Sequence, residues 1–120
     1  MGSAFGRRIK QRRRELDRSL RKVCQDVLNE DGKPISVSYL NDIEQGYRNP
    51  PNGKIIVQLA KALQLDEQAL LGLAGRPDPL IEEAMSKDRR VGMLFRKIAK
   101  EASHDPGVIE RVRKVIEGGS

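Results

Sequence analysis

The chain has 120 residues, enough for one compact domain or for one domain with a helical appendage. Its 23 Lys and Arg residues exceed its 17 Asp and Glu residues, which gives a formal net charge of +6. The single cysteine excludes an intrachain disulfide, and no apolar run approaches the roughly 20 residues of a membrane-spanning helix.

The positive charge is concentrated in the first 24 residues. They hold nine basic and two acidic side chains, a local charge of +7, whereas the other 96 residues sum to −1. This distribution favours a polyanionic partner that touches the N-terminal segment. The alternative is an arginine-rich helix face that is simply solvated.

The first expected helix covers residues 5–16, where Phe5, Ile9 and Leu16 follow helical spacing among basic residues. Arg13 lies one turn after Ile9, at the edge of the buried stripe, which is unusual for a side chain meant only for solvent.

A second helix is expected after Ser19, a good N-cap, over residues 20 to 28 or 29. Its apolar stripe is made of Leu20, Val23, Cys24, Val27 and Leu28. We interpret Cys24 as a small buried hydrophobe rather than a reactive thiol, because no His or second Cys stands nearby. Residues 29–34, which contain Gly32 and Pro34, predict a loop.

The chain is organised around residues 36–46, which read SVSYLNDIEQG. Ser36 can cap a helix, and Gly46 can end it, because glycine tolerates the left-handed conformation. At about 100° per residue, one side gathers Tyr39, Leu40 and Ile43, and the other gathers Ser38, Asn41 and Gln45, flanked by Val37 and Asp42. In a basic protein, such a helix is a candidate for reading base edges in a major groove.

Further helices are expected after a proline-rich loop at residues 47–53. One covers residues 54–65, and a short one capped by Asp66 ends at Leu73. Three more amphipathic helices follow Pro77, opened by Asp78, Asp88 and Asp105. About forty residues in three helices cannot easily enclose their own core, so they must pack on the first domain or on a second copy.

The residue types and their spacing along the chain match the pattern of a known family. The matching positions are Ile9 and Arg13, Ser19, Val23 and Cys24, Ile35 and Ser36, Tyr39-Leu40-x-x-Ile43-Glu44-x-Gly46, Asn49-Pro50-Pro51, Leu59-Ala60-x-x-Leu63, and Asp66 with Leu70. The chain therefore resembles the Cro/C1-type (XRE-like) helix-turn-helix family over about residues 5–76.

The resemblance implies an all-α fold with a five-helix, lambda-repressor-like DNA-binding domain at residues 5–76, followed by about three C-terminal helices at residues 77–118. It makes the second and third helices the helix-turn-helix, with the third as the recognition helix. It also pairs Arg13 with Glu44, a structural ion pair that ties the first helix to the recognition helix.

Two departures from the family pattern stand out. About six extra residues separate Cys24 from Ile35, so either the second helix is longer or a small loop projects there, with Lys33 near a phosphate. Many relatives place Gln at the start of the second helix, where this chain has Leu20. The buttressing contact of that Gln is then lost, and Ser19 or Arg21 would contact the phosphate.

The expected DNA-contacting residues fall into two groups. The base-contacting group is Val37, Ser38, Asn41, Asp42 and Gln45, of which Gln45 lies late enough to reach only the backbone. The phosphate-contacting group is Ser19, Arg21, Tyr47, Arg48, Asn49 and Lys54. Taken alone, each of these residues could equally be an ordinary solvent-exposed surface residue.

We therefore expect a sequence-specific double-stranded DNA-binding transcriptional regulator, a repressor, that works as a homodimer through its C-terminal helices in a bacterial or phage-encoded, cytoplasmic setting. One alternative is an antitoxin-like or phage-type regulator whose C-terminal helices bind a protein partner, and another is a lid folded back on its own domain. An enzyme is disfavoured, because His104 and Cys24 lie far apart and no phosphate loop or metal-ligand cluster is present. No cofactor is expected.

Overall fold

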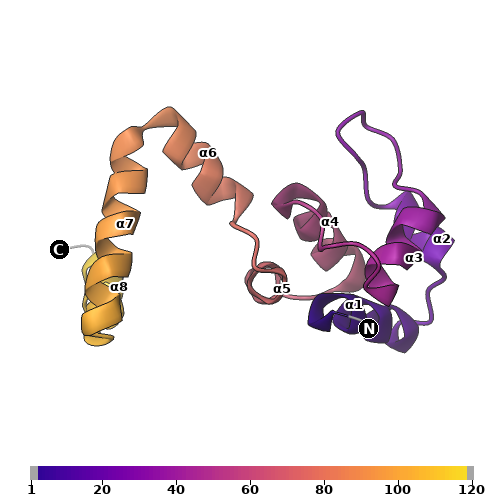
Figure 1. The fold of residues 1–120 in the computed structure, drawn as a ribbon, viewed down its shortest axis with the longest axis horizontal. Coiled ribbons are helices and arrows are strands. Elements are labelled where there is room, and N and C mark those ends of the chain that lie inside the picture. Colours follow the sequence, from indigo (N-terminus) through magenta and orange to yellow (C-terminus); the bar gives the residue numbers. More distant parts are fainter. Residues whose placement is uncertain (1–2, 119–120) are drawn as a thin grey trace. The chain divides into compact units, whose positions relative to one another are not determined.

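The computed structural model describes residues 3–118, which form eight helices and no β-strand. The helices are α1 (Ala4–Glu15), α2 (Leu20–Gln25), α3 (Val37–Gln45), α4 (Gly53–Leu63), α5 (Glu67–Ala74), α6 (Pro79–Lys87), α7 (Arg89–His104) and α8 (Gly107–Gly118). The predicted all-α fold class is confirmed (Figure 1). None of the described helices combines the length and the apolar run needed to cross a bilayer.

The chain divides into two compact units, one ending at Pro79 and the other beginning at Leu80. In the first unit, α1 packs on α3, α4 and α5, while α2 packs on α3 and α4. The largest fully buried side chains of its core are Phe5, Ile9, Val23, Val27, Leu40, Ile43, Ile56, Leu59 and Leu63. Complete burial of a Leu, Ile or Phe side chain contributes about 1.5–3 kcal/mol, so this core holds the five helices together.

Side-chain caps begin the helices of the first unit. The predicted caps are confirmed: Ser19, Ser36 and Asp66 accept hydrogen bonds from the backbone amides of Lys22, Tyr39 and Ala69, respectively. At the end of α3, Gly46 has a φ of 82°, the left-handed conformation that its residue type predicts. Helix α3 therefore has both of the boundaries expected from the sequence.

Both boundaries expected for the helix at residues 54–65 are wrong. Helix α4 begins one residue early, at Gly53, because the Asn52 side chain accepts a hydrogen bond from the Ile55 amide at 3.0 Å. It ends at Leu63 rather than at residue 65, because Gln64 adopts a left-handed conformation with a φ of 55°.

The second helix is also shorter than expected, because α2 ends at Gln25 rather than at residue 28 or 29. Residues 27–35 instead form a finger, in which the Ile35 amide donates to the Val27 carbonyl and Leu28 forms an isolated antiparallel bridge with Pro34. The Gln58 side chain accepts from the Leu28 amide at 2.7 Å and donates to its carbonyl at 2.9 Å. Figure 1 shows this finger projecting between α2 and α3.

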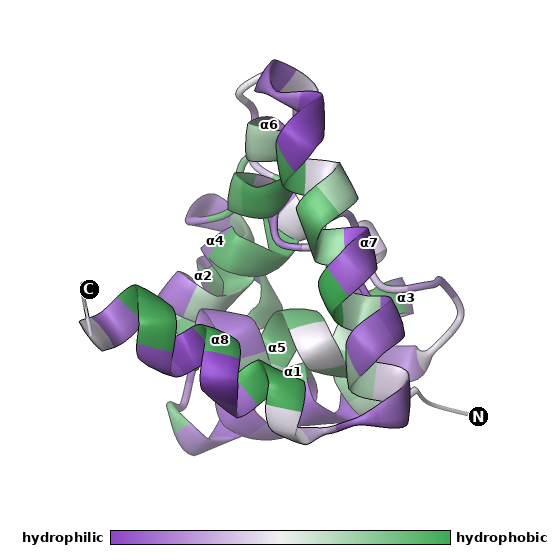
Figure 2. Ribbon diagram, turned by 90° about the vertical axis from the view of Figure 1, so that its left-hand side faces the viewer, coloured by the Kyte–Doolittle hydropathy of each residue, from purple (hydrophilic) through white to green (hydrophobic). Residues whose placement is uncertain are grey.

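The second unit contains most of α6 together with α7 and α8, and α7 packs on α8. None of its described residues is buried. Hydrophobic residues line α7 and α8, as the green segments of Figure 2 show. The predicted stripe residues Leu94 and Phe95 are exposed, as are Ile109, Val115 and Ile116. The unit thus leaves part of each amphipathic helix uncovered.

We predict that Gly6→Ala destabilises the first unit, whereas Gly72→Ala does not. A Cβ on Gly6 would lie 2.3 Å from the Ile43 carbonyl oxygen and 2.9 Å from that of Glu44, so α1 and α3 would have to separate. Overpacking of this kind typically costs about 1–3 kcal/mol. A Cβ on Gly72, inside α5, would meet nothing within 4 Å, and alanine should stabilise that helix by up to about 1 kcal/mol.

Urea unfolding followed by circular dichroism measures both variants. Equal stability of Gly6→Ala and the parent protein would show that α1 and α3 do not approach each other this closely.

Candidate nucleic-acid interface

Helix α3 has a buried side and a polar outer side. Leu40 and Ile43 are buried, and Tyr39 is half-buried against the core. On the outer side, Val37 and Ser38 are exposed and Asn41 is half-buried, as are Asp42 and Gln45. The structure thus places the five expected base-contacting side chains on or beside the face of α3 that does not enter the core.

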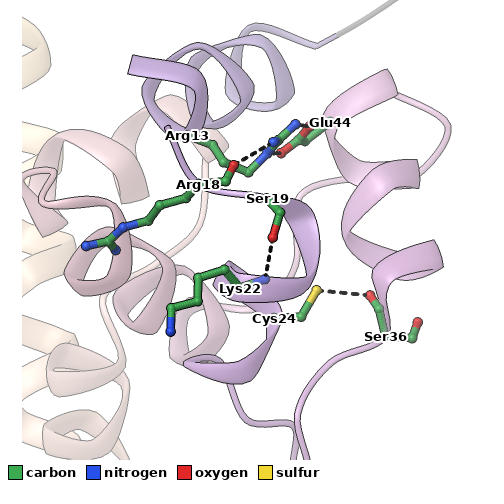
Figure 3. A network of polar contacts seen from close by, with 7 residues as sticks. All are labelled: Arg13, Arg18, Ser19, Lys22, Cys24, Ser36 and Glu44. Carbon is green, nitrogen blue, oxygen red and sulfur yellow. Dashed lines mark hydrogen bonds and ion pairs between the residues drawn. The ribbon is translucent and has the colours of Figure 1, made fainter. Parts of the chain in front are cut away.

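A bidentate ion pair fastens α3 to α1. Arg13 Nε donates to Glu44 Oε2 at 2.7 Å, and Arg13 Nη2 donates to Oε1 at 2.9 Å. The side chains are only 12% and 2% exposed, respectively. Arg13 Nη1 also donates to the Arg18 carbonyl at 2.9 Å, so the guanidinium joins three segments (Figure 3). The hydrogen bonds to Glu44 raise the pKa of Arg13 above its ordinary value, which keeps the arginine charged.

Part of the N-terminal positive charge serves the fold rather than a partner. Arg12 Nε donates to the Leu63 carbonyl at 3.0 Å, and Arg18 donates to the Ala62 carbonyl. These carbonyls belong to the last turn of α4, which has no intrahelical donors left for them. Arg12, Arg13 and Arg18 therefore make structural contacts. Charge counting alone could not separate them from Arg14, Arg21 and Lys22, which are exposed.

The expected phosphate-contacting residues lie at helix starts and in one loop. Ser19 and Arg21 are at the start of α2, and Lys54 is in the first turn of α4; all three are exposed. Leu20, at the position where many relatives have Gln, packs on the core instead. Tyr47, Arg48 and Asn49 follow α3 and are also exposed.

The loop after α3 is held in place from both ends. The Tyr47 and Arg48 amides donate to the Asp42 carbonyl at 2.9 and 3.3 Å. Further along, the Arg76 guanidinium donates twice to the Pro50 carbonyl, at 3.2 and 2.7 Å. The exposed side chains of this loop therefore project from a fixed backbone.

Arg48 has two contacts with α3 that sequence reasoning missed. Its Nε lies 3.5 Å from Asp42 Oδ2, and its guanidinium carbon lies 5.3 Å from the centroid of the Tyr39 ring. The i, i+3 spacing of Tyr39 and Asp42 puts them on one flank of the helix, and Arg48 follows two residues after the Gly46 turn. That spacing is the signal from which the cluster could have been anticipated.

The finger carries little that would attract a phosphate. The Asn29 side chain accepts from the Asp31 and Lys33 amides at 2.9 and 3.1 Å, which shapes its tip. Glu30, Asp31 and Lys33 are all exposed. Of the two arrangements expected for the extra residues, the structure has the projecting loop, and its tip has a net negative charge.

Cys24 is buried at the α2–α3 contact. Its Sγ lies 3.5 Å from the Ser36 carbonyl oxygen (Figure 3), and burial raises the pKa of the thiol above its ordinary value. A raised pKa keeps the thiol protonated and less nucleophilic, in line with the interpretation of a small core residue. Residues 3–118 contain no group of three or more His, Cys, Asp or Glu side chains that could hold a metal ion.

Comparison with known proteins places this arrangement in a family. The family model described as "Helix-turn-helix domain" matches residues 4–72, more than half of the chain. The chain belongs to the helix-turn-helix domain family. No curated protein and no solved structure matches it.

The family match confirms the predicted helix-turn-helix domain and is consistent with the resemblance to Cro/C1-type proteins. It covers the whole of α1 to α4 and most of α5, so the helix-turn-helix domain coincides with the unit that has a packed core. A helix-turn-helix domain supports a role in DNA binding. Helices α6, α7 and α8 lie outside the match.

We predict that Glu44→Ala destabilises the helix-turn-helix domain by about 3 kcal/mol, because it leaves the mostly buried Arg13 charge without its partner. The matched control is Glu83→Ala, which breaks the exposed Glu83–Lys87 pair in α6 and should change stability by less than about 0.5 kcal/mol. Thermal unfolding of each variant measures the difference. A Glu44→Ala protein as stable as the control would contradict a structural role for the pair.

Proposed function

We propose that the protein is a sequence-specific double-stranded DNA-binding transcriptional regulator that inserts α3 into the major groove. The observation that carries the proposal is the two-sided character of α3. One side is anchored by Leu40, Ile43 and the Arg13–Glu44 pair, while the opposite side presents hydrogen-bonding groups to the exterior. A helix that reads the major groove needs both properties, because hydrogen bonds to base edges require a helix whose orientation is fixed.

In this proposal, Asn41 is the central base reader, because its amide can donate to and accept from adenine in a bidentate pair. Ser38 and Gln45 lie on the same side, and Val37 can contact a thymine methyl group. The residues proposed to contact phosphates are Ser19, Arg21, Tyr47, Arg48, Asn49 and Lys54. Phosphate contacts position the domain without specifying sequence.

We further propose that the protein acts as a homodimer through α7 and α8. These helices carry exposed apolar side chains, among them Phe95, which is 45% exposed, and Ile116, which is 74% exposed. A unit of this size without a buried residue has too little core to be stable alone, and a second copy would cover the uncovered stripe. Two-fold pairing would also supply two half-sites about 34 Å apart.

We propose a repressor role, because a dimer seated in the major groove would exclude other proteins from the same duplex. The exposed stripe on α7 and α8 also favours a second candidate, in which these helices bind a different protein, as in an antitoxin-like or phage-type regulator.

Selection of binding sites from random duplex DNA tests the DNA-binding proposal. We expect a palindromic site whose two halves lie about one helical turn apart. Asn41→Ala should relax the preference at one or two base pairs per half-site, by about 1–3 kcal/mol of discrimination, while total binding to non-specific DNA stays unchanged. An unaltered base profile for Asn41→Ala would remove Asn41 from the readout, and failure of the parent protein to retain any duplex would end the proposal.

Sedimentation at concentrations on the order of tens of micromolar tests the dimer. The parent protein should sediment as a dimer, and Ile116→Glu should shift it toward monomer, because a charge would be buried in the proposed interface. Lys100→Glu, at an exposed basic position of α7, is the matched control and should remain dimeric. A monomeric parent protein, with and without DNA, would contradict the homodimer and favour the protein-partner candidate.

A further inference from the structure

Two arginines contact opposite flanks of α3, and their surroundings differ. Arg13 is held in a mostly buried bidentate pair with Glu44. Arg48 is 57% exposed and its partner Asp42 is 34% exposed, and a single Nε–Oδ2 distance of 3.5 Å joins them. The Tyr39 ring lies beneath the Arg48 guanidinium, 5.3 Å away. A buried bidentate ion pair fixes α1 to α3, whereas an exposed guanidinium with a single long contact remains available to a ligand.

The contacts of Arg48 leave its terminal nitrogens available. Within residues 3–118, the Arg48 side chain has no ion pair other than the one with Asp42 and donates no hydrogen bond, so Nη1 and Nη2 face no protein acceptor. An exposed ion pair of this kind adds little to stability. The Tyr39 ring and the Asp42 carboxylate instead restrict the long Arg48 side chain, which otherwise samples many rotamers. Such restriction has its largest effect when the guanidinium must meet a partner at that place.

The carboxylate of Asp42 points to the same conclusion. A negative charge on the flank of a helix that enters DNA is repelled by the phosphates unless a cation neutralises it. Arg48 supplies that cation. The oxygen nearest to Arg48 is also less available to accept a hydrogen bond from cytosine N4, the role expected for Asp42 from the sequence.

We propose that Tyr39 and Asp42 are positioning residues that hold the Arg48 guanidinium ready for a backbone phosphate of the bound duplex. The inference rests on the proposed DNA-binding function, and it moves Asp42 from base readout to phosphate positioning. Tyr39 supplies the flat surface over which the guanidinium lies, Asp42 supplies the charge that orients Nε, and Nη1 and Nη2 contact the phosphate oxygens.

The experiment is a double-mutant cycle on DNA affinity, using the full chain and the duplex obtained by site selection, over a range of salt concentrations. Arg48→Ala should weaken selected and non-specific duplexes alike and should flatten the salt dependence of log K by about 0.9. Tyr39→Leu and Asp42→Asn should each weaken binding by about two- to fivefold, without altering the base profile. In an Arg48→Ala background, Tyr39→Leu should have no further effect, and Asp42→Asn should no longer weaken binding, because the unneutralised carboxylate then only repels the phosphates.

Two further variants separate positioning from stability or from charge alone. Tyr39→Phe keeps the ring and should restore the affinity lost in Tyr39→Leu, and circular dichroism of both variants reports whether the fold is retained. Lys61→Ala removes a positive charge from the exposed surface of α4 and serves as the charge control, with an effect well below that of Arg48→Ala.

Several outcomes would overturn the inference. Asp42→Asn binding more tightly would mean that the carboxylate only repels DNA, and an altered base profile that persists without Arg48 would return Asp42 to base readout. A Tyr39→Leu loss of equal size with and without Arg48 would make the ring merely structural. If the parent protein binds duplex DNA and all three single variants match it, this inference fails alone. If the parent protein binds no duplex, the proposed function fails with it.

Discussion

The Arg13–Glu44 ion pair is the constraint on which the geometry of the helix-turn-helix domain depends. Neither charge can be left alone in the low-exposure contact between α1 and α3, because an unpaired charge there would lose its hydration without compensation. The two parallel hydrogen bonds set both distance and angle, and the close backbone approach at Gly6 allows the helices to meet. The outward direction of Asn41 and Ser38 follows from this attachment.

The same pairing chemistry has a different consequence at Arg48. Arg13 and Arg48 each face a carboxylate of α3, but solvent screens the Arg48–Asp42 pair and hardly reaches the other. Because it is buried, Arg13 links α1 to α3 permanently. Because it is exposed, Arg48 can exchange Asp42 for another partner. Residue type therefore does not distinguish the buried arginine from the exposed one, whereas accessible surface does.

The two units also differ in how far they bury their apolar side chains. In the helix-turn-helix domain, the side chains of α1, α3 and α4 meet in one core, and the exposed helix ends receive caps from Ser36, Asn52 and Asp66. In the second unit, α7 and α8 pack on each other but leave Phe95 and Ile116 uncovered. A pair of amphipathic helices buries only part of its apolar side chains, since two helices cannot enclose a core from all sides.

The sequence by itself determined the local features: the periodicity that buries Leu40 and Ile43, the Ser36 cap, the Gly46 stop and the family pattern. These depend on near neighbours, which the chain order already specifies. Only the tertiary structure decided that α2 stops at Gln25, because Gln58, thirty residues away from Leu28, binds the backbone there. It also decided that Arg12 and Arg18 cap α4, and that Tyr39 and Asp42 lie in contact with Arg48. Such contacts join side chains across turns and helices, so no periodicity along the chain encodes them.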